Sequence, residues 1–402
     1  MSEINSQIVT NLQKKYGEAF YILDSSQFEK NYLDMKQAFS ALYPKFNIAY
    51  SYKTNYIPKL CKIVNELNGY AEVVSEMELE LALKCGVEAE KIIWNGPIKD
   101  RECLKKFLVL GGTVNIDSIE EAIYIEKISR NSDKVLNVGI RCNYDVQDGV
   151  VSRFGLDIEG RDFRTVLEKV TTSTKLYLKS FQCHFANRQI KYWPNRVQQM
   201  LKLLDNVGVI PEMIDFGGGI FGKMEDELKQ QFSEIIPSYE EYAKVIATEF
   251  NRFFMTKERK PELIIEPGTA LVGNCMEFVG VVKTIKCVRG KHFASVLGSQ
   301  KNISMSGINP PIQIIHMSDG KKYDNLDFVG YTCIEGDVLY HNYSGKLAVG
   351  DVIVISNCGS YSLVMKPPFI LPNFPIIDLS NNETEVIKRK ENFEDIFRTF
   401  IF

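Results

Sequence analysis

Short apolar runs alternate with amphipathic stretches along the first two thirds of the chain. We predict eight buried strands: 47–53, 70–75, 91–96, 113–117, 136–142, 178–185, 213–218 and 262–268. Each of the first seven is followed by a segment in which apolar residues recur at helical spacing. This alternation is typical of a closed (β/α)8 TIM-type barrel, which is the α/β fold that we predict. An open doubly wound sheet is the alternative.

Beyond residue 270 the pattern changes to strand-like runs separated by turn residues, with little helical periodicity. The predicted strands are 278–288, 292–298, 311–317, 331–340 and 351–361. They indicate a second, mostly antiparallel β domain, and the early strand 20–24 is assigned to it as well. We therefore predict a barrel over 25–270 and a β domain formed by 1–24 plus 271–402. The last stretch, 391–402, predicts an amphipathic helix.

The composition is that of an ordinary globular protein, with 402 residues, 45% hydrophobic and 25% charged. A net charge of −3 without a basic block argues against nucleic acid or an anionic membrane as a partner. We expect a cytoplasmic protein, because we find neither a secretory leader nor a long apolar segment. The nine cysteines are scattered without a C-x2-C pair, so we predict no disulfide framework and no metal site.

Ionisable residues occur where several predicted barrel strands end, and the active site of such a barrel lies at these ends. They are Lys53, Glu72, His184 and Glu266. A lysine in an apolar strand either extends its ammonium group to water or loses its proton. In the second case it can form a Schiff base with a carbonyl group. The position of Lys53 after the first barrel strand favours the second interpretation.

The run Gly217-Gly218-Gly219 follows the seventh predicted strand. It is compatible with a plain turn, with a phosphate cradle made of backbone N–H groups, or with a dinucleotide site. A dinucleotide site would require the run after the first strand of a βαβ unit, so its position favours phosphate.

Two further residues each permit a structural and a functional interpretation. Glu266 is buried by pattern and needs a partner, which is either a barrel arginine or an aromatic nitrogen that becomes protonated. His184 is either an inert core histidine or a flat ring that stacks on a planar ligand.

These residues and their surrounding motifs resemble the fold type III pyridoxal-phosphate enzymes, which include the diaminopimelate and ornithine decarboxylases. The matching stretches are YSYKTN, AEVVSEMELELALKCGV, IIWNGPIK, SRFGL, CHFAN, IDFGGG, EPG, TCIEGDVL and GDVIVISNCGSYS. They occur in the family's order over about residues 20–370. The resemblance implies an alanine-racemase-like barrel with a β domain and pyridoxal 5'-phosphate as cofactor.

The resemblance also implies a role for each matched residue. Lys53 would bind the cofactor as the internal aldimine, His184 would stack on its ring, and Glu266 would pair with its pyridine nitrogen. The other residues expected around the cofactor and its phosphate are Glu72, Arg153, Asn187, Gly217, Gly218, Gly219, Gly268, Thr269 and Tyr361.

Cys333 would donate a proton after carbon dioxide leaves, and it would come from the β domain of the opposite subunit. The resemblance thus implies a homodimer with shared active sites. Ile334, Glu335 and Asp337 follow Cys333 and are assigned to substrate binding. A buried thiol is the alternative for Cys333.

Three departures from the family pattern concern the substrate. Diaminopimelate decarboxylases have an arginine where this chain has Thr269, and that arginine helps to hold the far carboxylate of the substrate. They have an acid directly after the cysteine, where this chain has Ile334, with Glu335 one position later. A strand would turn Glu335 away, although a bulge could restore it. Asn187 replaces the usual serine of the histidine motif.

We therefore predict a pyridoxal-phosphate-dependent decarboxylase that acts on the α-amino acid end of a conjugated or carrier-bound molecule. Specialised biosynthesis, such as siderophore or antibiotic assembly, would suit these departures better than lysine synthesis. The alternatives are a racemase or epimerase on the same fold, a non-catalytic regulator, and a Schiff-base aldolase without the cofactor.

Overall fold

The computed structural model describes residues 4–305, 307–380 and 384–402. The chain divides into two compact units. The first comprises Asn31–Phe221 and Pro237–Ala270, and the second comprises the chain up to Lys30, Gly222–Ile236 and Leu271–Phe402. The second unit therefore includes 25–30 and 222–236, which the sequence analysis had assigned to the barrel.

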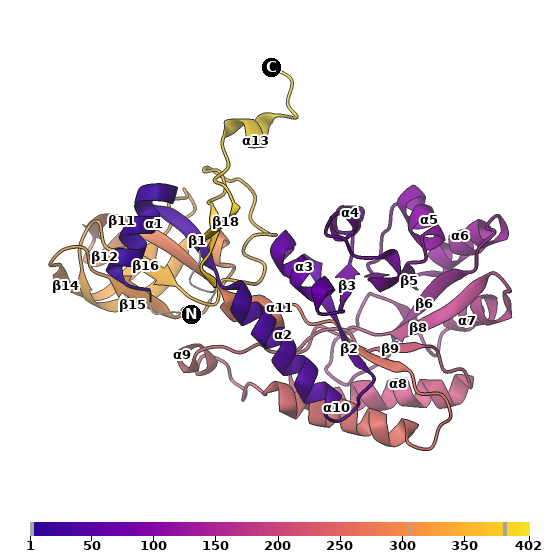
Figure 1. Ribbon diagram of the computed structural model, residues 1–402. Coiled ribbons are helices and arrows are strands. Elements are labelled where there is room, and N and C mark those ends of the chain that lie inside the picture. The colour runs from indigo at the N-terminus through magenta and orange to yellow at the C-terminus, as the bar shows by residue number, and fades with distance from the viewer. Residues whose placement is uncertain (1–3, 306, 381–383) are drawn as a thin grey trace. The chain divides into compact units, whose positions relative to one another are not determined.

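The first unit contains a closed barrel of eight parallel strands (Figure 1). These are β2 (Phe46–Ser51), β3 (Tyr70–Val73), β4 (Ile92–Trp94), β5 (Thr113–Ile116), β6 (Leu136–Asn143), β8 (Leu176–Gln182), β9 (Met213–Asp215) and β10 (Glu262–Ile265). Their order is β5-β4-β3-β2-β10-β9-β8-β6, and the pairing of β5 with β6 closes the circle. The predicted barrel is thus confirmed, and the open sheet is excluded.

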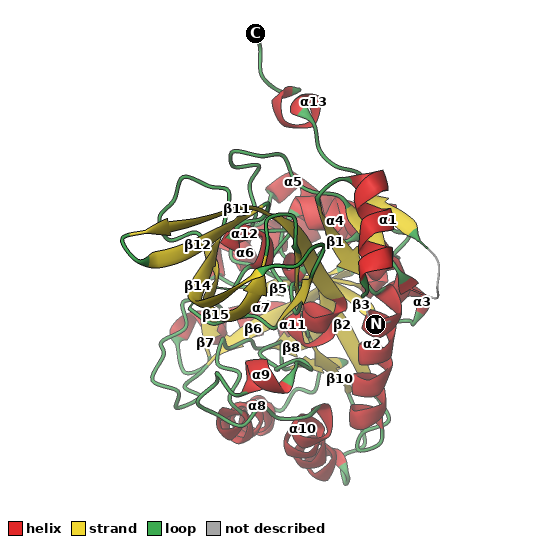
Figure 2. Cartoon of the chain, turned by 90° about the vertical axis from the view of Figure 1, so that its left-hand side faces the viewer, coloured by secondary structure: helices red, strands yellow, loops and turns green. Residues whose placement is uncertain are grey.

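Helices follow the first seven barrel strands, as the sequence pattern predicts. They are α3 (Pro58–Glu66), α4 (Glu76–Lys84), α5 (Arg101–Val109), α6 (Ile119–Arg130), α7 (Arg161–Thr172), α8 (Trp193–Val207) and α10 (Tyr239–Phe254), and α2 (Ser25–Ser40) precedes the first barrel strand. Short elements are η1 (Tyr52–Thr54), η2 (Ala89–Lys91), η3 (Ile190–Tyr192) and β7 (Leu156–Asp157). Ser75, Asp100 and Ser118 cap α4, α5 and α6 by accepting backbone N–H bonds with their side chains. Helices α8 and α10 lie side by side (Figure 2).

The second unit is built on a mostly antiparallel sheet. Its strands are β1 (Ala19–Leu23), β11 (Met276–Val288), β12 (Lys291–Val296), β13 (Ile312–Ile315), β14 (Lys321–Val329), β15 (Val338–Leu347), β16 (Val352–Ile355), β17 (Ile376–Asp378) and β18 (Glu385–Lys388). The main path is β15-β14-β12-β11-β1-β17-β18, and β16 pairs with β11 and β13. The β1–β17 and β12–β14 pairs are parallel.

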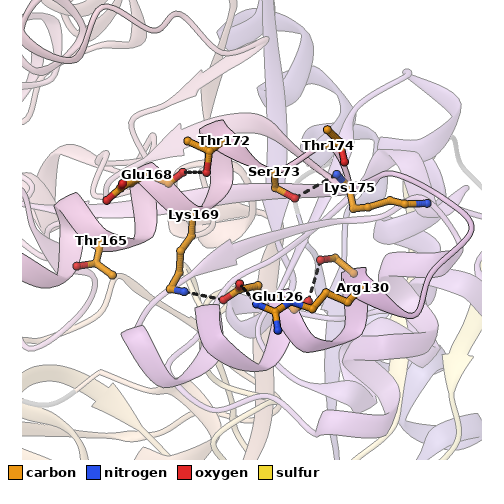
Figure 3. Close-up of a pocket in the computed structure, with 10 residues that line it drawn as sticks. Glu126, Arg130, Thr165, Glu168, Lys169, Thr172, Ser173, Thr174 and Lys175 are labelled. Carbon is orange, nitrogen blue, oxygen red and sulfur yellow. Dashed lines mark hydrogen bonds and ion pairs between the residues drawn. The ribbon is translucent and has the colours of Figure 1, made fainter.

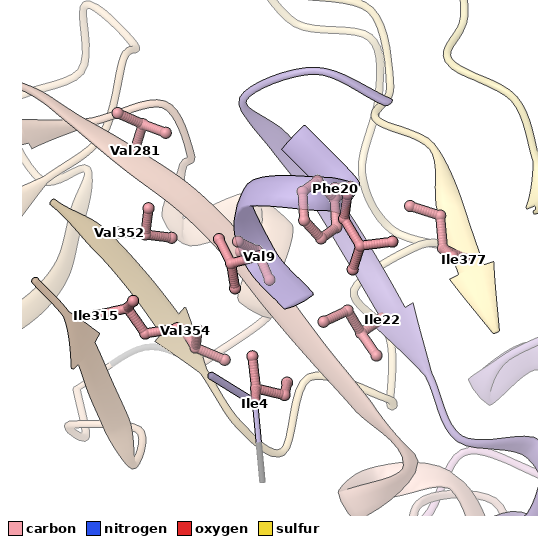
Figure 4. Packing of buried hydrophobic residues seen from close by; sticks show 11 residues of the cluster. Ile4, Val9, Phe20, Ile22, Val281, Ile315, Val352, Val354 and Ile377 are labelled. Carbon is pink, nitrogen blue, oxygen red and sulfur yellow. The ribbon is translucent and has the colours of Figure 1, made fainter. Parts of the chain in front are cut away.

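Helix α1 (Ser6–Tyr16) covers this sheet and completes its core. Apolar side chains from α1 and five strands form one cluster (Figure 4), which includes Ile4, Val9, Phe20, Ile22, Val281, Ile315, Val352, Val354 and Ile377. The unit's remaining short helices are α9 (Asp226–Lys229), η4 (Gly273–Cys275), α12 (Gln300–Ile303) and α13 (Phe393–Phe397), and α11 (Thr269–Val272) joins the two units along the chain.

Three predicted elements of this unit differ from the structure. The strand expected over 351–361 ends at Ile355. The strand expected over 331–340 begins only at Val338, because the Asp337 N–H donates to the Ile334 carbonyl at 3.0 Å and closes a turn there. The helix expected over 391–402 is limited to α13. The rings of Phe393 and Phe397 stack on each other at 4.4 Å instead of on the core, and Phe402 is 91% exposed.

No helix among the described residues is long and apolar enough to cross a membrane.

Candidate active site

Lys53 lies just beyond the first barrel strand and is held by a buried carboxylate. β2 is buried along its whole length, and Lys53 follows it within η1. Its Nζ is 2.5 Å from Oε2 of Glu72, and the two side chains are 33% and 1% exposed. Burial alone would raise the pKa of Glu72, but the Lys53 ammonium and hydrogen bonds from Ser51 and Asn95 hold it below its ordinary value.

Asn95 connects Glu72 to the second predicted carboxylate. Its amide Nδ2 donates to Glu72 Oε1 at 3.0 Å and to Glu266 Oε1 at 2.6 Å. Glu266, which is 2% exposed, also accepts from Gln182 Nε2 at 3.2 Å. Residues in or directly after the four strands β3, β4, β8 and β10 thus contribute to one buried polar network at the C-terminal end of the barrel.

The network carries more carboxyl groups than cations. Burial, together with the nearby Glu72 carboxylate, raises the pKa of Glu266 to about 7. Burial and the neighbouring Glu266 also raise the pKa of Asp215 well above its ordinary value. Asp215 Oδ2 is buried without a hydrogen-bond partner among the described residues. Such a set of carboxyl groups favours a ligand with a cationic or protonated nitrogen.

His184 presents a neutral ring in this site. The Gly218 N–H donates to its Nδ1 at 2.9 Å, so this nitrogen acts as an acceptor and carries no proton. Burial and the Lys53 ammonium hold the pKa of His184 well below its usual value. Nδ1 is also 3.8 Å from Oε2 of Glu266. A neutral flat imidazole can stack on a planar ligand.

The glycine run packs so closely that side chains are excluded. A Cβ on Gly217 would lie 2.4 Å from the Cys183 carbonyl oxygen, and one on Gly218 would lie 2.6 Å from that of Glu266. Among the hydrogen bonds of the described residues, the N–H groups of Gly219 and Ile220 have no acceptor. They are donors available to an anionic group.

The other predicted residues of the barrel unit contribute less directly. Arg153 is exposed, and its guanidinium lies 4.0 Å from the Phe154 ring. The side chain of Asn187 accepts from the Gln189 N–H, so it shapes its own loop. Gly268 and Thr269 follow Glu266, and a Cβ on Gly268 would lie 1.9 Å from Thr54 Oγ1.

The remaining predicted residues belong to the second unit. Cys333, Ile334 and Glu335 are exposed in the turn before β15, so strand alternation does not determine where Glu335 points. Asp337 is buried, and its carboxylate accepts from Ser299, Gln300 and Thr332. It therefore holds the loop that carries Cys333. Tyr361 lies in a turn with a left-handed φ of 61°.

Sequence reasoning missed the neutral members of the network. Asn115 donates to Asn95 Oδ1 at 2.8 Å and accepts from Ser180 Oγ at 2.7 Å. Gly139 faces both, and a Cβ there would lie 1.8 Å from Asn115 Oδ1. Asn95 directly follows an apolar strand, and this position could have identified it as a site residue. Asn115 and Ser180 lie inside strands, and their sequence positions do not indicate a role in the site.

A cavity of about 590 Å³ lies elsewhere, near the C-terminal ends of α6 and α7 (Figure 3). Its cations are already engaged: Arg130 and Lys169 both pair with Glu126, and Lys175 Nζ donates to the Ser132 carbonyl. None of the predicted site residues lines it. In the part of the chain that the structure describes, no group of three metal-ligating side chains occurs.

The residues at the barrel end fit pyridoxal phosphate. Lys53 offers an amine for an aldehyde, and the raised pKa of the buried Glu266 suits a protonated ring nitrogen. His184 offers a neutral flat ring. The amides of Gly219 and Ile220 offer hydrogen bonds for a phosphate.

The raised pKa of Glu266 predicts a pH-dependent difference in stability. Its ordinary pKa is 4.5 and its folded-state pKa is about 7, so ionisation between these values opposes folding. In cofactor-free protein, Glu266→Gln should match the wild type near pH 5 and exceed its melting temperature at pH 8. Thermal unfolding at both pH values measures this. A difference between the two proteins that does not change with pH would contradict the prediction.

Comparisons with known proteins identify the family of the chain. Residues 25–273 match the family described as "Pyridoxal-dependent decarboxylase, pyridoxal binding domain". Diaminopimelate decarboxylase of Archaeoglobus fulgidus is 25% identical, over 96% of this chain and 94% of the relative. L-glutamyl-[BtrI acyl-carrier protein] decarboxylase of Niallia circulans is 27% identical, over 97% and 95%.

Solved structures share the fold. The crystal structure of diaminopimelate decarboxylase from M. jannaschii superposes with a TM-score of 0.87 at 22% identity, covering 98% of this chain and 94% of that one. An SrLDC mutant in complex with PLP superposes with a TM-score of 0.76 at 18% identity, covering 98% and 96%. The relatives' names favour decarboxylation over racemisation. The chain belongs to the pyridoxal-dependent decarboxylase family and is a pyridoxal-phosphate-dependent amino-acid decarboxylase.

Proposed function

We propose that this enzyme decarboxylates an amino acid whose far end is conjugated, in the simplest case a glutamyl group bound through its distal carboxyl to a carrier protein. The absence of charge at residues 269 and 334, which we assign to the substrate, supports this proposal. Thr269 follows Glu266-Pro267-Gly268, and Ile334, which follows Cys333, is 50% exposed. A distal carboxyl that is bound in an ester or thioester has no charge for an arginine to pair with, and a glutamyl group has no distal amine for an acid to pair with.

The name of one relative supports the same substrate class. That protein is called a decarboxylase of an L-glutamyl group on an acyl-carrier protein, and it is similar over almost the whole chain. Most other curated relatives are named diaminopimelate decarboxylases. The neutral residues at 269 and 334 are our reason for preferring the carrier-bound substrate. A role in specialised biosynthesis in the cytoplasm would follow.

The residues of the barrel end have separate tasks in this proposal. When bound, pyridoxal phosphate supplies the electron sink for the carbanion left by carbon dioxide. Lys53 holds the cofactor aldehyde, and Glu72 keeps the lysine in place. Glu266 keeps a proton on the ring nitrogen, His184 covers the ring face, and Gly217–Gly219 with Gly268 surround the phosphate. Arg153 and Asn187 complete the surroundings of the cofactor.

The partner subunit's Cys333 completes the reaction in a homodimer with shared sites. The bond between the α-carbon and the carboxylate breaks, carbon dioxide leaves, and the electron pair stays at the α-carbon. The Cys333 Sγ–H gives its proton to that carbon. Its exposure in the turn before β15 suits this transfer. Asp337 fixes the turn, and Glu335 lies beside the substrate.

The substrate proposal predicts a preference that can be measured directly. Carbon dioxide release should have a kcat/KM at least about a hundredfold higher for a carrier-bound glutamyl group than for free meso-diaminopimelate. Product mass on the carrier identifies the bond that was broken. Efficient turnover of free meso-diaminopimelate would overturn the substrate proposal and leave the cofactor assignment intact.

A variant of Thr269 serves as the matched control. Thr269→Arg restores the cation that diaminopimelate decarboxylases have at this position. It should improve turnover of a free substrate with a distal carboxylate and impair turnover of the carrier-bound one. Equal effects on both substrates would contradict a role of residue 269 in recognising the far end.

A further inference from the structure

Arg196 is a buried cation without an acidic partner. It lies in the first turn of α8 and is 1% exposed. Its guanidinium is 3.9 Å from the Trp193 ring and 5.3 Å from that of Phe185. No carboxylate of the described residues forms an ion pair with it, Asp148 attracts it only from a greater distance, and its Nε has no hydrogen-bond partner there. A buried charge without a counter-charge is costly, so its retention calls for a reason.

The guanidinium joins the two loops that carry the candidate cofactor residues. Nη1 donates to the carbonyl of Gly218 at 2.8 Å and to that of Phe216 at 3.5 Å. Nη2 donates to the carbonyl of Phe185 at 3.0 Å and to that of Asn187 at 3.3 Å. The Arg196 side chain thereby connects the loop after β8 with the glycine run after β9.

This arrangement determines the direction of a backbone donor. In a trans peptide, the carbonyl of one residue and the N–H of the next point in opposite directions. Because the Gly218 carbonyl points at Arg196, the Gly219 N–H points away from it, and it has no acceptor among the described residues. Gly219 has a φ of +85°, and a Cβ there would lie 2.9 Å from the Phe185 oxygen, so only glycine permits this close packing.

We propose that Arg196 is a positioning residue for the phosphate of the cofactor. It orients the Gly219 N–H toward the phosphate and places an unpaired positive charge behind the loop that binds it. In a low-dielectric environment this charge attracts the phosphate across the glycine run, which has no side chains. The inference rests on the family's cofactor, and it concerns only the end of the site that binds the anion.

Binding of two aldehydes to the cofactor-free protein separates this role from a general structural one. Pyridoxal phosphate and pyridoxal differ only in the phosphate. Arg196→Met should weaken binding of pyridoxal phosphate at least about 30-fold and change binding of pyridoxal less than about threefold. Arg196→Lys keeps the charge but cannot reach four carbonyls, so its loss should be intermediate. Absorbance or fluorescence titration gives the six dissociation constants, two for the wild type and two for each Arg196 variant.

Lys202→Gln is the matched control, since Lys202 is exposed on the same helix. It should bind both aldehydes like the wild type. Equal losses for both aldehydes in Arg196→Met, or no loss for either, would overturn the proposal. If the wild type itself failed to bind pyridoxal phosphate, the cofactor assignment would fail instead.

A measurement on the wild type covers the case in which the Arg196 variants do not fold. Inorganic phosphate added to the cofactor-free protein should slow hydrogen exchange in the peptide that contains Gly219 and Ile220, relative to chloride at equal ionic strength. Unchanged exchange in this peptide at saturating phosphate would overturn the proposal.

Discussion

Replacing Lys53 with alanine should abolish decarboxylation. Lys53 is the amine at the end of the barrel that lies 2.5 Å from the buried Glu72, and the proposed function assigns it to the cofactor aldehyde. We expect kcat to fall at least about a thousandfold, because covalent attachment and orientation are lost together. Carbon dioxide release measures the rate. Borohydride treatment followed by peptide mass analysis should detect a pyridoxyl group on Lys53 in the wild type and none at this position in the variant.

Lys84→Ala is the control, because Lys84 is an exposed lysine of α4 that pairs with Glu80. It should retain full activity. Retention of a tenth of the activity in Lys53→Ala would exclude the proposed role.

Mixing Lys53→Ala with Cys333→Ala tests the shared sites. Half of the dimers are then mixed, and each mixed dimer has one intact site, so about a quarter of the wild-type activity should return. Dimers that regain nothing would contradict shared sites.

Replacing Asn95 with leucine should destabilise the barrel strongly. The Asn95 amide donates to both Glu72 and Glu266, and Asn115 donates to it. Leucine has a similar volume but leaves two buried carboxyl groups without this donor. We expect the free energy of unfolding to fall by about 3 kcal/mol in denaturant titrations. The loss should be larger at pH 8 than at pH 5, because an ionised Glu266 needs the donor more than a protonated one.

Asn137→Leu is a matched control on strand β6 of the same barrel. Its amide donates to one neutral acceptor, the Gly111 carbonyl at 2.9 Å. Its loss should cost about 1 kcal/mol and be the same at both pH values. Equal losses in the two variants would show that the carboxyl groups do not depend on Asn95.

The barrel could be predicted because parallel strands are covered on both faces. Their sequences are therefore apolar throughout, as in β2, and the helices between them have a different periodicity. Strand β14 was missed because it is exposed over much of its length and contains several charged residues. The strand predicted over 331–340 started too early, since local hydrogen bonds of Asp337 close a turn that the apolar pattern alone does not reveal.

The charged part of the site could be predicted for a related reason. A lysine or glutamate at the end of an apolar strand is conspicuous, and Lys53, Glu72 and Glu266 lie in one network. Arg196 was missed because an arginine in an amphipathic helix resembles a surface residue. Its burial depends on the tertiary contacts of Trp193 and Phe185.

The tight layer formed by Asn115, Ser180 and Gly139 has a consequence for laboratory evolution. Each of these residues fits only against the present form of the others, since even one methyl group on Gly139 would overlap Asn115. Single replacements here should be deleterious in isolation and tolerated only in coordinated combinations. A mutational library aimed at new substrates would therefore retain diversity in the exposed turn around Ile334 and lose it in this layer.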